Sequence, residues 1–324
     1  MPRLSHHLFQ QFLLGVCVWL GSTGWMPAAE ATSKPSLRWK FRAGQTLYLK
    51  AKRQSVLSLS LAGGLVDIKQ TLRLNAQLDV EAARAGGVIR LTQRFDRVRL
   101  GVMFSTGAET SYDSSSREEA DVPAPLRKAL DHLADESTEI TLSDGGRVTK
   151  VEPTVPLRRA LGELGENDVL QIGGIVSVAG LRELAQSWFF VLPKLAPYKG
   201  QKWTDSFLTR VTPQVRVNLD NEYRYVGYEE VNGKRLLRFG MEPAASIAEE
   251  STVEAEVWNV NGSGVVLFDP KKGRGVRTEL ETRYRLRWKA QGGTTKRGRL
   301  QIRLEVRRDE RRDKRRGTRS TNGR

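Results

Sequence analysis

A serine nucleophile is the first chemistry that the residue types allow. Asp113 is followed by three serines at 114–116, and His132 lies close in sequence to Asp131 and Asp135. A serine, a histidine base and a carboxylate that orients the base make up the catalytic triad of many hydrolases. These serines are not part of a Gly-x-Ser-x-Gly turn, and Asp-Ser-Ser after a strand is typical of a turn capped by its own side chains. We therefore expect a turn here and no catalytic residue.

Other reactive centres are excluded by composition or lack a motif. The 37 Asp and Glu residues offer many carboxylate pairs for glycosidase-type chemistry, but no spacing singles one out. There is no P-loop and no Gly-x-Gly-x-x-Gly after a strand, so no nucleotide site is indicated. Cleavage of a signal peptide after Ala31 would remove the single cysteine, Cys17, and leave His132 as the one histidine. Cysteine nucleophiles and multi-histidine metal sites are then excluded, and we expect no cofactor and no metal.

The sharpest feature is a basic C-terminus. Residues 296–324 contain 13 Lys and Arg and four acids, a net charge of +9 out of +16 for the 324-residue chain. Arginine-rich tails bind polyanions by releasing counterions, and a basic segment gains about 1 kcal/mol per residue near an anionic surface. A tail that only improves solubility is the alternative. The residues expected to hold an anionic surface are Arg307, Arg308, Arg311, Arg312, Lys314, Arg315, Arg316 and Arg319.

The same patch could extend onto the last two predicted strands. Arginines that alternate with other residues along a strand share one face, and the ones concerned are Arg283, Arg285, Arg287, Arg299 and Arg303. Pairing with acids across neighbouring strands would neutralise them instead, and the acids available are Glu279, Glu281 and Glu305. Both outcomes stay open at the level of sequence.

An apolar stripe over residues 178–192 has helical spacing, with Ser177 as a cap and Pro193 as a stop. Such a stripe commonly packs on a sheet. A helix in the mouth of a curled antiparallel sheet is also how several exported lipid carriers enclose acyl chains, which is an analogy between folds. The residues expected to line an apolar ligand are Leu181, Leu184, Trp188 and Phe189.

The N-terminus predicts a signal peptide. Arg3 precedes an apolar run from Phe12 to Leu20, and Ala29 and Ala31 fit the A-x-A rule for cleavage. The run is shorter than the ~20 apolar residues of a spanning helix, which disfavours a retained anchor. We expect an exported protein, periplasmic or associated with the cell envelope, with no transmembrane segment after cleavage.

Alternating apolar residues predict the elements that would position these side chains. Residues 47–61 and 66–80 form a long hairpin, and 89–104 a third strand whose apolar parity shifts near Asp96, as at a β-bulge. In the second half the predicted strands are 210–219, 222–231, 235–239, 252–260, 265–268, 276–288 and 300–306, with turns at 232–233 and 261–264. The second turn contains an N-glycosylation sequon, Asn261-Gly262-Ser263, which we interpret as a turn signal. Helices are predicted around 126–133, 157–164 and 178–191.

These elements predict a mainly β protein with two curled antiparallel sheets, for which a duplicated half-barrel like that of a lipid carrier is one form, and two or three connecting helices. The predicted divisions are a signal peptide at 1–31, β-rich halves at 32–152 and 197–307, a helical connector at 153–196 and a disordered basic tail at 308–324. Two similar segments favour duplication: Phe41…Gly44-Gln45 matches Tyr198…Gly200-Gln201, and the turn before Val148 matches the one before Val276.

A set of short motifs carries a resemblance to a known family. The motifs are Leu37-Arg38-Trp39-Lys40-Phe41 with Gly44-Gln45, then Tyr112-Asp113-Ser114, the turn at 146–148, Pro193 with Gly200 and Trp203, and Phe268-Asp269 with Gly273-Arg274. Over roughly Leu37 to Arg307 the chain resembles a family of exported bacterial proteins that is common in planctomycetes. The resemblance implies an exported, β-rich protein; it supplies no activity, and the long arginine-rich tail departs from it.

The function predicted from these observations is non-enzymatic binding of an apolar or anionic envelope component. The expected partners are lipid headgroups or acidic polysaccharide and a lipid-like ligand, and we do not expect nucleic acid. An envelope-associated protein–protein interaction module without a small ligand is the alternative, and a carboxylate-based hydrolase is third.

Overall fold

Long antiparallel strands make up most of the structure. The computed structural model describes residues 37–61, 64–83, 87–164, 177–193, 195–210, 215–249, 251–289, 294–310 and 312, which belong to one compact unit. Its strands are β1 (Thr46–Leu61), β2 (Gly64–Ala83), β3 (Ile89–Phe104), β4 (Glu109–Asp113), β5 (Ser137–Leu142), β6 (Val148–Pro153), β7 (Lys202–Arg210), β8 (Arg216–Val231), β9 (Lys234–Ile247), β10 (Ala255–Asp269), β11 (Arg274–Lys289) and β12 (Thr295–Arg308). Its helices are the 3₁₀ turn η1 (Arg117–Glu119) and α1 (Ala124–Asp135), α2 (Val155–Gly162) and α4 (Val178–Trp188). The predicted signal peptide lies outside the described residues.

The strands form a single sheet in the order β6-β5-β3-β2-β1-β12-β11-β10-β9-β8-β7, with β4 paired to β3. The predicted class, mainly β with curled antiparallel strands and connecting helices, is confirmed. The two sheets expected from the sequence are joined into one because β12 pairs with β1 on one side and with β11 on the other. Without β12, β1 and β11 would each present a long row of unpaired backbone groups.

Each half of the sheet is a meander of the same plan. In the first half the neighbours are β1-β2-β3-β5-β6 and in the second β7-β8-β9-β10-β11, each in chain order, so that β12 is the added strand. The turns that open the two halves make the same hydrogen bonds: Gly44 N to Val80 O and Val80 N to Gln45 O, both at 2.8 Å, and Gly200 N to Tyr225 O at 2.8 Å and Tyr225 N to Gln201 O at 3.0 Å. A register shift follows each, between Val80 and Ala82 and between Tyr225 and Gly227. These matches support the predicted duplication.

The predicted strands of the first half are confirmed, and two predictions in the second half are wrong. The hairpin of β1 and β2 and the limits of β3 agree with the sequence, and Asp96 is the residue left over at the register shift opposite Asn75 and Ala76. The segments 210–219 and 222–231 were expected as separate strands, but β8 runs without a break from Arg216 to Val231. Burial of Asn221 within the sheet outweighs the turn preference of its sequence neighbourhood.

The turn predicted at 261–264 is also wrong, because β10 continues through it. Gly262 and Gly264 are needed for a different reason. A Cβ on Gly262 would lie 2.2 Å from the Glu281 carbonyl oxygen, and one on Gly264 would lie 2.6 Å from the Glu279 carbonyl oxygen. The glycines therefore allow close approach of β10 to β11. By contrast, Asn232 and Gly233 have φ of 51° and 70° and form the predicted turn between β8 and β9.

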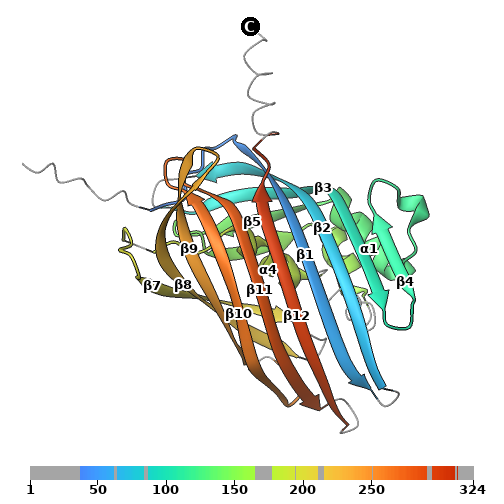
Figure 1. Cartoon of the computed structure of the whole chain (residues 1–324). Coiled ribbons are helices and arrows are strands. Elements are labelled where there is room, and N and C mark those ends of the chain that lie inside the picture. The colour runs from blue at the N-terminus through green and yellow to red at the C-terminus, as the bar shows by residue number, and fades with distance from the viewer. Residues whose placement is uncertain are drawn as a thin grey trace, which may run out of the picture. The chain divides into compact units, whose positions relative to one another are not determined.

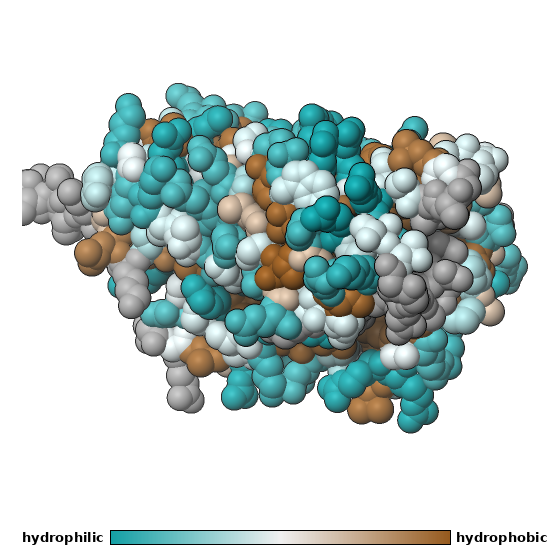
Figure 2. Space-filling view, turned by 90° about the horizontal axis from the view of Figure 1, so that it is seen from below, coloured by the Kyte–Doolittle hydropathy of each residue, from teal (hydrophilic) through white to brown (hydrophobic). Residues whose placement is uncertain are grey.

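The helices lie on the concave side of the curved sheet (Figure 1). The predicted helices are confirmed, and α1 buries Leu126, Ala129, Leu130 and Leu133 as its periodicity required. Helix α4 begins after Ser177, whose hydroxyl accepts a hydrogen bond from Gly180 N at 2.9 Å, but ends at Trp188 rather than 191. Seen from below, one end of the molecule shows apolar residues in the middle of a largely hydrophilic surface (Figure 2).

Candidate functional site

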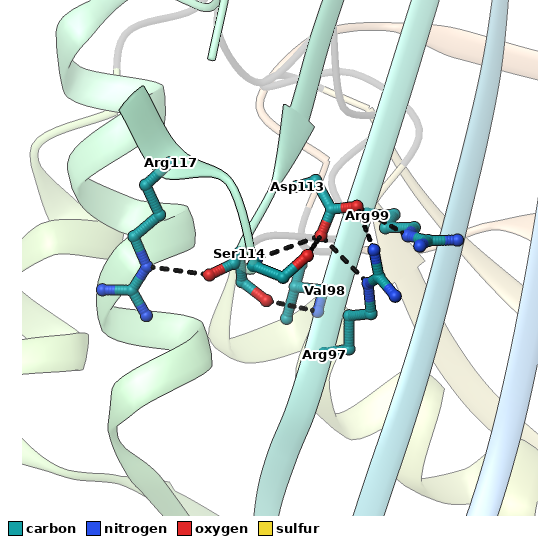
Figure 3. Close-up of polar contacts among 7 residues, drawn as sticks. Arg97, Val98, Arg99, Asp113, Ser114 and Arg117 are labelled. Atoms are coloured by element: carbon teal, nitrogen blue, oxygen red, sulfur yellow. Dashed lines mark hydrogen bonds and ion pairs between the residues drawn. The ribbon is translucent and has the colours of Figure 1, made fainter. Parts of the chain in front are cut away.

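The serine cluster after β4 is a structural turn (Figure 3). Asp113 accepts hydrogen bonds from Arg97 at 2.7 and 3.0 Å, from Arg99 at 2.7 Å, and from the backbone and hydroxyl of Ser115 at 3.0 and 2.8 Å. These bonds, led by the one from Arg97, hold the pKa of Asp113 well below its usual range. The Ser114 hydroxyl accepts from Val98 N at 3.0 Å. The serines therefore cap a turn, as expected, and their carboxylate partner is neutralised by two arginines.

His132 takes no part in this cluster. Its Nδ1 lies 4.0 Å from the Glu136 carboxylate on its own helix, and no hydrogen bond within the described ranges joins it to the serines. Asp131 accepts instead from the Tyr112 hydroxyl at 2.8 Å, which together with burial raises the pKa of Tyr112. Asp135 pairs with Arg117. The geometry thus separates the three members of the hypothetical triad.

The four residues predicted to line an apolar ligand are all buried, at 2–7% exposure, but they have different surroundings. Phe189 packs edge-on against Trp39 with ring centroids 5.5 Å apart, and Trp188 against Phe95 at 6.2 Å. Leu181 lies in the same core. Leu184 alone among the four lines a cavity.

This cavity lies between α4 and the concave face of the sheet and has a volume of about 60 Å³. It is placed where the two meanders meet, because β1, β2, β8, β11 and β12 all contribute to its wall. Most of the wall is apolar, and the lining residues are Ala51, Arg53, Leu72, Leu74, Glu183, Leu184, Gln186, Ser187, Phe190, Phe207, Leu219, Asn221, Tyr223, Met241, Thr278, Leu280, Thr282, Ile302 and Leu304. We refer to it as the α4 cavity.

Three polar atoms of the α4 cavity wall are buried without a hydrogen-bond partner in the described part of the chain. They are Arg53 Nε, Asn221 Oδ1 and Thr282 Oγ1. An unsatisfied buried polar atom costs about 1–3 kcal/mol, so such atoms are rare unless water or a ligand completes them. Convergence of three on one mostly apolar cavity is the pattern of a small-molecule site.

The charged groups at this wall form one ion pair. Arg53 Nη1 lies 3.2 Å from Glu183 Oε1, and both side chains are 15% exposed or less. The pair connects β1 to α4 across the cavity. Glu183 is the single acid among the lining residues of the cavity, so no second carboxylate is placed there for acid–base catalysis. Burial, reinforced by the charge of Glu183, raises the pKa of the neighbouring Tyr284 hydroxyl, which stays neutral.

The most deeply buried acid among the described residues is Asp205 on β7. Asp205 is 2% exposed and lies 3.1 Å from the Arg147 guanidinium, yet burial raises its pKa because Arg147 is largely in solvent. The partner of Asp205 is thus an arginine and not a second carboxylate. No group of three or more His, Cys, Asp or Glu among the described residues could hold a metal ion.

The described part of the basic tail is bound to the protein itself. Arg307 pairs with Glu305, and Arg312 pairs with Asp96 and lies over the Tyr48 ring, 4.8 Å from its centroid. Arg308 ends β12 and also has interaction partners. The remaining predicted residues lie outside the described residues; they are Arg311, Lys314, Arg315, Arg316 and Arg319. The sequence alone does not locate these intramolecular partners, which come from β3, β1 and β12.

No helix in the described ranges is both long and apolar enough to cross a membrane. No protein-family model and no curated protein matches the chain. Among solved structures, one of lipovitellin, concerned with lipid–protein interactions, aligns with 83% of this chain at 9% identity and a TM-score of 0.47, and the chain spans 25% of its length. A protein with a YmcC-like fold from Bacteroides fragilis aligns with 85% of this chain and 99% of its own length at 12% identity and a TM-score of 0.30. An outer membrane channel from Pseudomonas putida aligns with 84% and 97% at 8% identity and a TM-score of 0.22. Likeness at this level carries no conclusion about ligand or activity.

Proposed function

We propose that this protein is an exported, non-enzymatic binding protein that holds an apolar, lipid-like molecule between α4 and the concave face of its sheet. The observation that carries the proposal is the α4 cavity, which combines an apolar wall with three buried polar atoms that have no partner among the described residues. A ligand with a hydrocarbon body and one hydrogen-bonding end would satisfy both. Arg53 Nε and the Thr282 hydroxyl would donate to that end, and Asn221 Oδ1 would accept from it.

The ligand would enter by displacing α4. A cavity of about 60 Å³ is well below the roughly 300–1,000 Å³ of a site for a drug-sized molecule. The polar contacts that hold α4 are the Arg53–Glu183 pair, the hydrogen bond from Arg182 to Val148 O at 3.3 Å, and Gln186, whose Oε1 accepts from Val148 N at 3.0 Å. The movement would also have to separate its apolar side chains, such as Leu181 and Trp188, from the core. Outward movement of α4 would enlarge the cavity along the apolar inner faces of β1, β11 and β12.

Native mass spectrometry tests this proposal. The protein would be expressed with its own N-terminus in a periplasmic host, and a mass that begins at residue 32 would verify the predicted cleavage after Ala31. Copurifying lipid-like adducts are expected, and a neutral fluorescent probe such as N-phenyl-1-naphthylamine should be displaced by the extracted ligand. Absence of both adduct and probe binding would overturn the proposal and favour the interaction module.

A pair of variants on one helix locates the binding site. Leu184→Phe places a larger side chain in the α4 cavity and should weaken binding of the neutral probe several-fold. Leu181→Phe is the matched control, because it makes the same enlargement at a residue that is buried on the same helix but does not line the cavity. Equal binding by the two variants would place the probe elsewhere.

For the tail we keep the anionic surface, lipid headgroup or acidic polysaccharide, as the proposed partner. The intramolecular pairs of Arg307 and Arg312 leave the residues beyond 312 as the ones that would contact it.

A further inference from the structure

The outward face of the sheet contains a groove at the point where β10 bulges. β10 and β11 pair regularly on either side, but the register shifts between Trp258 and Asn261, and Asn259 has a φ of 51°. The bulge opens a groove of about 500 Å³ that is clearly separate from the α4 cavity. Its lining residues are Asn259, Val260, Asn261, Arg283, Tyr284, Arg285 and Arg299, and we call it the arginine groove.

Two arginines of the groove lie directly opposite each other. Arg285 on β11 pairs with Arg299 on β12, and both side chains are exposed. No ion pair or hydrogen bond to an acid is found for either among the described residues. Arg283 does have a carboxylate, but Glu281 is shared: Arg283 Nη2 lies 2.6 Å from its Oε1 and Arg303 Nη2 lies 2.8 Å from its Oε2. The groove therefore carries excess positive charge.

The next ladder position enlarges this charge. Arg287 lies opposite Arg297, and Arg287 alone has a carboxylate partner, Glu256 at 2.6 Å. Like charges placed directly opposite destabilise a sheet. Four residues from Arg285 along β11, the same ladder has an opposite-charge pair, Glu281 and Arg303. Two other like-charge pairs of this ladder, Arg277–Arg307 and Glu279–Glu305, compensate each other through ion pairs along their own strands. Arg285 and Arg299 have no such acid among the described residues, so a bound anion would relieve their repulsion.

The geometry favours a phosphate group over a carboxylate. Adjacent strands lie about 4.8 Å apart, so two opposed guanidinium groups can reach one ion, and each can donate two parallel hydrogen bonds. The acceptor sites of a carboxylate lie in one plane, whereas the oxygens of a phosphate group are arranged tetrahedrally and suit two guanidinium groups that approach from different strands. The amides of Asn259 and Asn261 add neutral donors at the edge of the groove.

We propose that the arginine groove binds a phosphate group, with Arg285 and Arg299 as its main ligands. The phosphate would belong to a lipid headgroup or to a soluble phosphate ester, which present the same chemistry. The proposal is independent of the α4 cavity and of the basic tail, because the groove lies on the opposite face of the sheet and is made of β10, β11 and β12.

Binding of full-length protein to two sets of probes tests the proposal. The first set is vesicles of phosphatidylglycerol in phosphatidylcholine, with phosphatidylcholine alone, whose phosphate is offset by its choline cation, as the uncharged reference. The second set is inorganic phosphate and glycerol 3-phosphate, measured by calorimetry. The variant Arg285→Gln with Arg299→Gln should bind phosphate roughly 25-fold more weakly, about fivefold for each guanidinium. Arg90→Gln with Arg94→Gln is the control: it removes the same charge from two exposed arginines of β3 and should bind as the wild type does.

The outcomes separate the source of the phosphate from the existence of the site. Vesicle binding that the first double variant weakens and the control does not, and that glycerol 3-phosphate does not displace, supports a membrane headgroup, whereas saturable binding of glycerol 3-phosphate supports a soluble ester. Equal losses in both double variants, or no loss in the first, would overturn the proposal, as would failure of every probe to bind. Arg299→Glu guards against misfolding: its carboxylate should pair with Arg285, abolish phosphate binding and leave the thermal midpoint at or above that of the wild type.

Discussion

Two pairs of arginines on the same sheet differ by one carboxylate. Arg97 and Arg99 both bond to Asp113, the last residue of β4 (Figure 3). Arg285 and Arg299 face each other across β11 and β12 with no acid bound to them in the described part of the chain. Arg99 also lies opposite another arginine, Arg73, yet Asp113 compensates for it on the other side.

An arginine pair acts differently with and without an acid from its own chain. With an acid supplied by the chain, the first cluster fixes β4, which pairs with β3 and with no other strand of the sheet order. Without such an acid, the second cluster adds repulsion and leaves its donors to solvent or to a ligand. Charge count alone does not distinguish the two, but the origin of the counter-charge does.

The largest difference in stability is expected between two glycine variants, one at the arginine groove and one beside Asp113. Gly262 lies at the bulge that opens the arginine groove, and an added Cβ would meet the Glu281 carbonyl oxygen at 2.2 Å, so Gly262→Ala should destabilise the protein by about 3 kcal/mol. Gly101 lies beside the Asp113 cluster with nothing within 4 Å of an added Cβ, so Gly101→Ala should be neutral or slightly stabilising. Urea unfolding of both variants checks this, and similar losses would show that the bulge does not depend on glycine.

Removal of the carboxylate from the first cluster has the next largest effect. Asp113→Asn leaves Arg97 and Arg99 without a counter-charge and should cost about 1–2 kcal/mol, less than a fully buried pair because the side chains are partly solvated. Glu109→Gln, at the other end of β4 and exposed, is the control and should be neutral. A loss of stability in chemical unfolding that is confined to Asp113→Asn would establish that Asp113 holds β4 against β3 through Arg97 and Arg99, an arrangement that we call the Asp113 clamp.

The dependence of stability on acid pH should also report on the Asp113 carboxylate. Because the hydrogen bond from Arg97 lowers the folded pKa of Asp113 below its ordinary value of 3.8, its contribution to stability is present above that value and is lost as the pH falls toward the folded pKa. The wild type should therefore lose more stability below pH 4 than Asp113→Asn does. Parallel acid titrations of the two proteins, followed by circular dichroism, would refute the clamp if they coincided.

The two arginine pairs also show which features of the fold can be predicted from the sequence. Period-two alternation identified β1, β2, β3, β11 and β12 and placed the arginines on one face, because alternation depends on local geometry alone. It left open which arginines would be neutralised. That outcome depends on register between strands, which put Glu281 opposite Arg303 and Arg285 opposite Arg299.

The errors have the same origin. Asn261-Gly262 has the local chemistry of a turn, but Gly262 is required by contact with a strand 19 residues farther along the chain. The α4 cavity was missed for the same reason, since its wall combines residues from seven strands, and of the four residues predicted to line a ligand only Leu184 belongs to it. A signal for it was present in Thr278 and Thr282, two polar residues on the mainly apolar face of β11, yet the burial of Thr282 was visible only in the fold.

The smallest change in stability is expected from a variant that supplies Arg285 with the acid that it lacks. Arg299→Glu replaces a like-charge pair by an opposite-charge pair at the same ladder position, and cross-strand pairs of this kind contribute roughly 0.2–1 kcal/mol. The variant should unfold at slightly higher urea concentration than the wild type, and high salt should erase the gain by screening. A loss of stability instead would mean that Arg299 already has a structural role, and the second cluster would then be a clamp like the first.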